Sequence, residues 1–180
     1  MTPQNAFLTL VPSGPETLPA NVPEIFGDES MMVITTRFGP MEFGRDNAVC
    51  MPRGLLGYAD RHDYGLVGLL QPGLEQFMLL QSLDDADLSF IVTPLNRDGE
   101  TMAEEDIEGA CNTLSLDAGT AAVLLVVSTT RLQNLTQVSV NLRAPIIVDV
   151  EAHKGWQHVL LSSRYPVRHV INEVDQNDQG

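Results

Sequence analysis

Apolar residues recur in short runs along the chain, separated by residues that favour turns. In the stretch VSVNLRAPIIVDV, Val138, Val140 and Leu142 alternate with Ser139 and Asn141, which is the period of a strand with one face in water. Comparable runs predict strands over 31–39, 42–52, 64–70, 75–82, 88–94, 121–129, 136–142, 145–150 and 156–163. Because these runs follow one another at short intervals with turn residues between them, we expect an all-β fold, either a sandwich or a barrel.

The turn residues make these expectations specific. Gly39-Pro40 predicts a turn between the first two strands, and Gln71-Pro72-Gly73 predicts a hairpin between 64–70 and 75–82. Pro145 has no N–H to donate to a ladder, so it should end one strand and begin the next at a bend. The amide of Asn141 would then meet backbone groups that the bend leaves free.

One segment has the periodicity of a helix. Thr101 and Glu104 have the spacing of a capping box, and the first turn after them is rich in carboxylates. Apolar residues then repeat at helical spacing at Ile107, Ala110, Cys111 and Leu114. We therefore expect one short α-helix near 102–114, with Cys111 as a core residue.

The 180-residue length fits a single domain, which we place at 31–171. Residues 1–30 are rich in proline and lack Lys and Arg, so we expect a flexible N-terminal arm without the basic region of a secretory signal. Residues 172–180 are expected to be a polar C-terminal tail. No apolar run is long enough to cross a membrane. Since no secretory signal is visible, we expect a cytoplasmic protein in which Cys50 and Cys111 are free thiols.

Charge is the unusual bulk property. Ten Lys and Arg residues oppose 24 Asp and Glu residues, which gives a net charge of −14, and Lys154 is the only lysine. Such a surface repels nucleic acid and anionic membrane, and it favours a basic protein partner. The simpler interpretation is that the charge serves solubility alone.

No catalytic or metal-binding constellation is visible. The sequence has no HExxH, GxSxG, Walker A or GxGxxG motif, and His153 and His158 have a spacing that places them on opposite faces of a strand. Asp84, Asp85 and Asp87 could in principle bind a divalent cation, but the glycine and glutamate of an EF-hand loop are absent. SLDDADL is more simply a turn in which Ser82 and the aspartates accept local N–H groups. We therefore expect no enzyme and no metal site.

Several segments, in order, resemble the FliW family of bacterial flagellar assembly factors. They are TRFGPMEF, GLLGYADRHDY, FMLLQSLDDADLSFIV, VSVNLRAPIIVDV, GWQHVL and RYPVRH. The most specific parts are LQSxDD and NLxAP. Leu79 and Ala86 replace the tryptophan and proline that are usual in the family, and the acidic segment 98–114 and the N-terminal arm depart from its pattern.

The resemblance implies an antiparallel β pseudo-barrel that acts by protein–protein interaction and needs no cofactor. It implies binding to flagellin in the cytoplasm and to the translational repressor CsrA, so that flagellin synthesis follows secretion, with no direct contact to nucleic acid or membrane. The free protein is expected to be monomeric. Expected partner-contact residues are Gln81, Asp84 and Asp85 from LQSxDD, and Asn141 and Arg143 from NLxAP; the alternative is that these side chains satisfy backbone groups at bends. From the residues alone, a flavin- or small-ligand-binding split barrel stays an alternative.

Overall fold

The computed structural model describes residues 31–69, 71–97, 101–133 and 135–175. These described residues form eleven strands, a 3-10 turn (Arg45–Asn47) and one α-helix, α1 (Glu104–Leu114). The strands are β1 (Met32–Thr36), β2 (Gly39–Phe43), β3 (Ala48–Cys50), β4 (Asp63–Gly68), β5 (Met78–Ser82), β6 (Ser89–Pro94), β7 (Ala121–Leu132), β8 (Leu135–Val140), β9 (Ile146–Asp149), β10 (Lys154–Gln157) and β11 (His169–Asp175). The expected all-β fold with one short helix is confirmed.

Seven strands close into a barrel. The larger sheet has the order β11-β8-β7-β6-β5-β4-β3-β10-β9, and a further antiparallel pairing of β9 with β7 closes the strands from β7 to β9 into the barrel. The pairs are antiparallel except for a single parallel bridge between Lys154 in β10 and Cys50 in β3. The hairpin expected around Gln71-Pro72-Gly73 is present as the β4–β5 pair.

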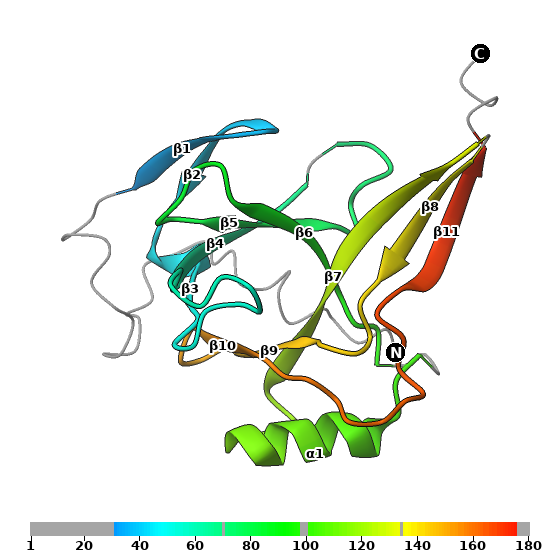
Figure 1. Ribbon diagram of the computed structural model, residues 1–180. Helices are drawn as coiled ribbons and strands as arrows, with labels where there is room; N and C mark the ends of the chain where they lie inside the picture. Colours follow the sequence, from blue (N-terminus) through cyan, green and yellow to red (C-terminus); the bar gives the residue numbers. More distant parts are fainter. Residues whose placement is uncertain (1–30, 70, 98–100, 134, 176–180) are drawn as a thin grey trace.

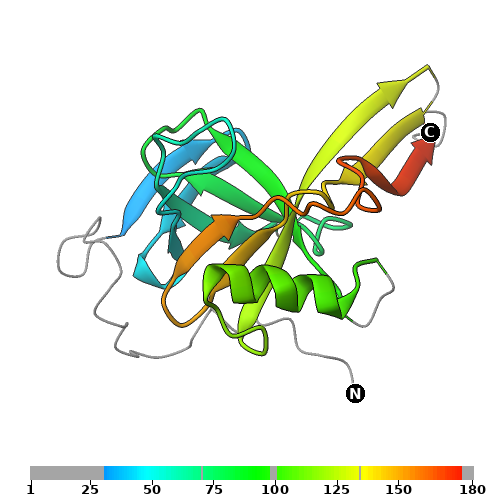
Figure 2. The same cartoon turned by 60° about the horizontal axis from the view of Figure 1, so that its bottom comes forward.

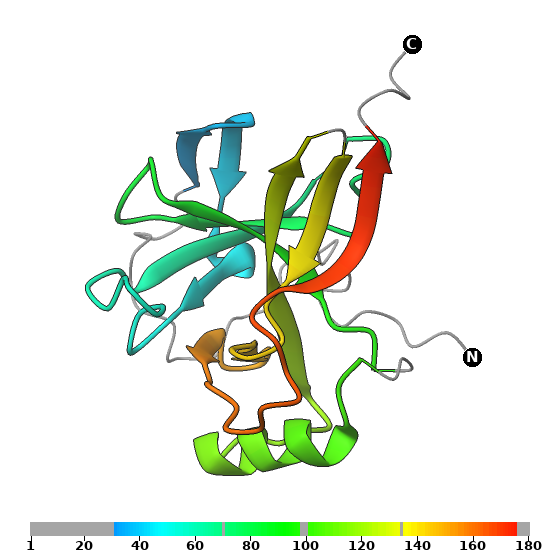
Figure 3. The same cartoon turned by 45° about the vertical axis from the view of Figure 1, so that its right-hand side comes forward.

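Strand β7 belongs to two parts of the molecule. Its first residues, 121–126, pair with β9 and β6 in the barrel, whereas Val127–Leu132 pair with β8. Strand β11 then pairs with the other edge of β8. The second half of β7, with β8 and β11, forms a three-stranded sheet that extends away from the barrel (Figure 1 and Figure 3). We call it the wing.

The barrel interior and its outer layers are separate apolar clusters. Inside are residues such as Met51, Tyr64, Leu80 and Ile146. The β1–β2 hairpin covers part of the outside, where the ring of Phe43 packs directly on Gly65; a Cβ at that glycine would lie 2.0 Å from the ring. Because β5 is covered on both faces, all five of its residues are buried.

Helix α1 covers another part of the barrel's outer surface, beside β7 and β9 (Figure 2). Ile107, Ala110 and Cys111 are its buried residues, as the helical spacing predicted. The alternation along β7 shows the two layers: Ala122 and Leu124 face the interior cluster, and Val123 and Leu125 face the helix.

Several sequence-based expectations differ from the structure. The strand expected over 42–52 is divided by the 3-10 turn into the end of β2 and β3, and the strand expected over 156–163 is β10, which ends at Gln157. Gly39 and Pro40 begin β2, so the first turn lies earlier, at 37–38. The helix is capped by Ala103 without a side-chain bond, so the capping box of Thr101 and Glu104 is wrong. Strand β11 continues to Asp175, four residues into the expected polar tail. The expected arm, 1–30, and residues 176–180 lie outside the described residues.

Candidate functional site

The expected contact residues fall into two groups. Gln81, Asp84 and Asp85 lie at the β5–β6 turn, and Asn141 and Arg143 lie in the bend between β8 and β9. No hydrogen bond or ion pair between the described residues joins one group to the other. Each group is therefore considered separately.

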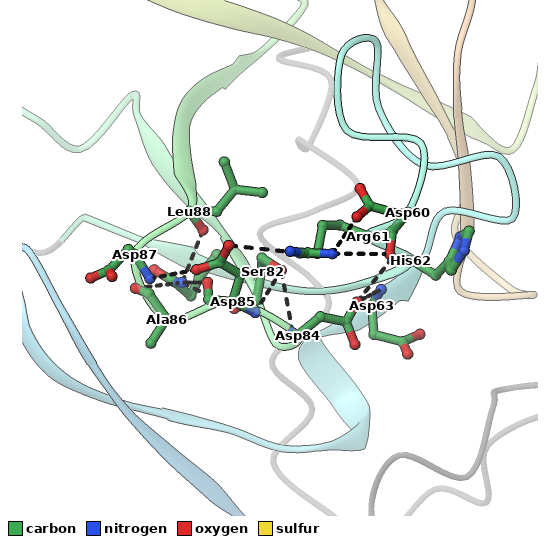
Figure 4. A network of polar contacts seen from close by, with 11 residues as sticks. Asp60, Arg61, His62, Asp63, Ser82, Asp84, Asp85, Ala86, Asp87 and Leu88 are labelled. Carbon is green, nitrogen blue, oxygen red and sulfur yellow. Dashed lines mark hydrogen bonds and ion pairs between the residues drawn. The ribbon is translucent and has the colours of Figure 1, made fainter.

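The β5–β6 turn is built by its own polar side chains, as the sequence predicted. Ser82 Oγ accepts the N–H groups of Asp84 and Asp85 at 3.2 and 3.1 Å, and Asp85 Oδ1 accepts the N–H of Asp87 at 3.1 Å. Figure 4 shows these contacts along the turn. Side-chain acceptors at this spacing fix a compact turn that hydrogen bonds between strands alone would not specify.

Gln81 is the fully buried centre of this turn. Its Nε2 lies 2.9 to 3.2 Å from four backbone carbonyl oxygens, those of Ser82, Asp85, Ala86 and Leu88. An amide nitrogen carries two hydrogens, so these carbonyls share them. The structure therefore gives Gln81 an internal role, matching the alternative that this amide satisfies backbone groups at a bend.

Asp84 fastens the turn to the segment that precedes β4. Its Oδ2 accepts the N–H groups of His62 and Asp63 at 2.9 and 3.1 Å, while the residue stays exposed (Figure 4). Burial, followed by the nearby charge of Asp84, raises the pKa of the Asp63 carboxyl above its ordinary value. The same two causes, in the same order, raise the pKa of Tyr64 to about 12.

Arg61 is a basic side chain that pairs with carboxylates beside the β5–β6 turn. Its Nη1 lies 2.6 Å from Asp60 Oδ2, and its Nε lies 3.6 Å from Asp85 Oδ2 (Figure 4). We define the acidic surface as Asp60, Asp63, Asp84, Asp85 and Asp87. With one arginine against these five carboxyl groups, the local field is negative, which suits contact with a cationic partner.

The β8–β9 bend uses its polar side chains in the same internal way. Strand β8 ends at Val140 and β9 begins at Ile146, so Pro145 lies between two strands as predicted. Asn141 Oδ1 accepts the N–H of Ala144 at 3.1 Å, which confirms its predicted role at the bend. Arg143 is half-buried, and its Nε donates to the carbonyl of Tyr165 at 2.7 Å.

Tyr165 links this bend to helix α1, and the sequence showed it only as part of RYPVRH. Its hydroxyl donates to Asp106 Oδ2 and accepts the N–H of Ala103 at 3.1 Å, at the beginning of the helix. Arg164 also pairs with Asp106. Hydrogen bonds from Tyr165 and then Arg164 lower the pKa of Asp106. No local pattern reveals contacts between residues 59 positions apart.

The described residues contain no group of three or more His, Cys, Asp or Glu side chains placed to hold a metal ion. Both cysteines are free, Cys111 buried and Cys50 half-buried. No helix in the described part of the chain is long and apolar enough to cross a membrane.

Residues 32–171 match the sequence profile of the FliW protein family. The chain belongs to the FliW family. It is 33% identical over 141 residues to a flagellar assembly factor FliW from Syntrophus aciditrophicus, which covers 78% of this chain and 87% of the relative. A flagellar assembly factor FliW from Geotalea uraniireducens is 31% identical over 151 residues, covering 83% and 89%.

A solved structure supports the FliW fold independently. The crystal structure of a flagellar assembly factor FliW is similar with a TM-score of 0.58 and 20% identity, covering 77% of this chain and 96% of the other. At this identity the likeness concerns the fold, and it agrees with the barrel and single helix described above. FliW relatives are named for flagellar assembly and not for a catalysed reaction.

Proposed function

We propose that this FliW protein is a cytoplasmic, non-enzymatic regulator that binds flagellin and antagonises a CsrA-like translational repressor. Flagellin synthesis would thereby follow flagellin secretion. Membership of the FliW family, whose members are named as flagellar assembly factors, supports a role in this process. The observation that carries the repressor contact is the acidic surface around the β5–β6 turn.

That surface has the electrostatics required of an RNA competitor. Asp60, Asp84 and Asp87 are exposed, and the whole chain carries a net charge of −14. A basic RNA-binding partner would be attracted to it, while RNA phosphates would be repelled. Because exposed charges are screened over about 8 Å at physiological ionic strength, this association should weaken as salt is added.

The repressor contact is tested with labelled RNA bound to the purified repressor. We expect titration with the full chain to release RNA, with less release at higher salt. Asp87→Lys should weaken association several-fold at low salt, because Asp87 is exposed and its carboxylate accepts no hydrogen bond from the described residues. Glu108→Lys on the exposed side of α1 makes the same charge change elsewhere and should have a smaller effect. RNA affinity that stays constant across excess added protein would refute the proposal.

Flagellin binding is proposed to depend on apolar burial. The terminal segments of an unassembled flagellin would be shielded by packing an apolar helix face on this protein. Apolar contacts are not screened, so this affinity should persist at salt concentrations that dissociate the repressor. Parallel titrations at two ionic strengths separate the two modes. A flagellin affinity that falls with salt as steeply as repressor affinity would contradict the apolar mode.

A further inference from the structure

The loop between β3 and β4 holds an apolar side chain at the surface. The N–H of Tyr58 donates to the carbonyl of Leu55 at 2.8 Å, and Gly57 has a φ of 86°, so residues 55–58 form a turn that favours glycine at its third position. Leu55 is buried in the barrel interior, whereas Leu56, at the second position of the turn, is 57% exposed. The turn therefore fixes Leu56 in an exposed position.

Gln157, the last residue of β10, joins this loop to the β8–β9 bend (Figure 1). Its Oε1 accepts the N–H of Leu56 at 2.9 Å, and its Nε2 donates to the carbonyl of Ala144 at 3.1 Å. A single amide thus binds both the loop and the bend. The loop, the bend and the segment that follows β10 therefore meet at one place.

The segment that follows β10 stays extended as it passes the bend. The N–H groups of residues 158 and 160 donate to the carbonyls of Pro145 and Arg143 at 2.9 and 2.8 Å. These bonds continue the β9–β10 pairing, in which Gln157 lies opposite Ile146. Because alternate residues of an extended segment lie on the same side, the side chain of Val159 lies on the side of Gln157.

This segment adds two exposed apolar side chains next to the loop. Leu160 belongs to the cluster beneath α1, whereas its neighbours Val159 and Leu161 are 44% and 96% exposed. We call Leu56, Val159 and Leu161 the apolar surface. Large apolar side chains that are exposed together on firmly held segments indicate an interaction site.

Local charge suits this surface to an acidic partner. Arg53, which is exposed beside the loop, and Arg143 in the bend form no ion pair with a carboxylate of the described residues. The three segments that meet here contain no Asp or Glu: 53–58, 141–145 and 157–161. The next carboxylate along the loop, that of Asp60, lies 2.6 Å from Arg61 Nη1. Because charges are screened beyond about 8 Å at physiological ionic strength, the two arginines outweigh the net charge of −14 at this place.

The backbone of the loop favours contact through side chains. The N–H groups of Leu56 and Tyr58 are already bonded within the protein, so they are not available to an added strand. An amphipathic helix needs no such donors, because it binds by burying its apolar face.

We propose that the apolar surface binds an amphipathic helix whose apolar face is bordered by carboxylates. Leu56, Val159 and Leu161 bury the apolar face, and Arg53 and Arg143 attract the carboxylates at its border. The inference rests on the proposed apolar mode of flagellin binding, because it names the place where that mode would act.

Two synthetic peptides of about 20 residues, long enough to form a helix, test the surface directly. Both have the same leucine face, which is bordered by Glu in one peptide and by Lys in the other. We expect the fluorescence anisotropy of the labelled peptides to show tighter binding of the Glu-bordered peptide at physiological ionic strength. Arg53→Glu should reduce this preference, because it reverses a charge that no described carboxylate pairs with.

Substitution of the apolar surface gives the second comparison. Leu56→Ser/Leu161→Ser should weaken binding of the Glu-bordered peptide at least about 10-fold, because two leucines no longer bury against it. The matched control is Val33→Ser/Leu132→Ser, which replaces exposed apolar residues of β1 and β7 and should change the affinity less than about 2-fold. Urea unfolding of each variant checks that it is folded.

Monomeric flagellin from the native cell is titrated in parallel with the peptides. We expect the same loss of affinity in Leu56→Ser/Leu161→Ser. Flagellin that binds the unsubstituted chain and this variant equally well would overturn the inference and leave the proposed function in place. Flagellin that binds neither protein, while the peptide results hold, would refute the proposed function and leave the surface in place.

Three peptide results would also overturn the inference. A Glu-bordered peptide that does not bind, or that binds both double variants equally, shows that this surface takes no such helix. A Lys-bordered peptide that binds as tightly as the Glu-bordered one contradicts the role of the arginines. Self-association of the unsubstituted chain that is lost in Leu56→Ser/Leu161→Ser assigns the surface to a second copy.

Discussion

The hydroxyl of Tyr165 donates a hydrogen bond to the carboxylate of Asp106, and this contact joins the β10–β11 connection to the first turn of α1. The same hydroxyl accepts the N–H of Ala103, one of the donors that the beginning of a helix leaves without an intrahelical partner. A tyrosine from a distant segment thus accepts the N–H of the N-cap residue, which the N3 side chain of a capping box would otherwise bind.

Removing this hydroxyl should destabilise the protein. We expect Tyr165→Phe to lower the free energy of unfolding by about 1 to 3 kcal/mol, since a hydrogen bond to a charged group is lost and a helix N–H loses its acceptor. Urea unfolding measures the change. Tyr58→Phe is the control, because Tyr58 is 40% exposed and its ring packs edge-on against Phe90. Equal unfolding midpoints for the two variants would contradict the capping role.

Removing the hydroxyl of Tyr64, unlike that of Tyr165, should not lower the free energy of unfolding. Its ring is fully buried in the barrel, and its hydroxyl has no hydrogen-bond partner among the described residues. Tyr64→Phe keeps the ring and removes a buried polar group, so we expect an unfolding free energy that is unchanged or higher by about 1 kcal/mol. Chemical denaturation at neutral pH is the measurement. A loss above about 1 kcal/mol would show that the hydroxyl is satisfied in solution.

Asp84 should matter more for stability than its neighbour Asp87. Asp84→Ala removes the acceptor of the His62 and Asp63 N–H groups, and we expect a loss of about 1 to 2 kcal/mol. Asp87→Ala removes an exposed carboxylate and should stay within about 0.5 kcal/mol. The urea unfolding midpoints of the two variants test this difference. A similar loss of unfolding free energy in both variants would mean that it comes from the removed charge and not from the two backbone hydrogen bonds.

The carboxyl groups of Asp63 and Asp106 should affect the stability of the fold with opposite dependences on pH. The raised pKa of Asp63 means that the folded protein binds this proton more tightly than the unfolded chain, so the group lowers stability as pH rises through its folded pKa. Asp63→Asn should therefore raise the thermal midpoint at pH 7, and the gain should vanish below about pH 4. Asp106 has a lowered pKa, and its stabilisation is present above about pH 4 and lost as pH falls through the folded value.

Thermal unfolding of Asp63→Asn and Asp106→Asn between pH 3 and pH 7 compares these signs directly. At the acid end of the range, the thermal midpoint of each variant should approach that of the unsubstituted chain. The midpoint of Asp63→Asn should approach it from above, and that of Asp106→Asn from below. Differences that do not change with pH would show that the substitutions act through packing and not through the charge of the carboxylate.

The sequence predicted best those features that local chemistry determines. Alternating apolar residues located most strands, the spacing of Ile107, Ala110 and Cys111 located the helix, and Ser82 correctly predicted the turn that it supports. Long-range contacts were beyond reach, because the acceptor for Ala103 lies 62 residues away on Tyr165. The capping-box prediction failed for this reason.

Strand β11 was missed because its pattern is not that of a core strand. Among the described strands it pairs with β8 alone. It has a register shift between Val170 and Asn172, and its first residues are largely exposed. Such an edge strand buries little, so alternation is weak. For the candidate site, the sequence predicted the turn and the bend but not that Arg61 and Tyr165 hold them in place.

The continuity of β7 has a mechanical consequence. One unbroken strand takes part in both the barrel and the wing. Ala121 to Leu124 pair with β9 and close the barrel, and Val127 to Leu132 pair with β8 in the wing. No loop separates these two parts of β7. We therefore expect a displacement of β8 or β11 to be transmitted along β7 to its pairing with β9.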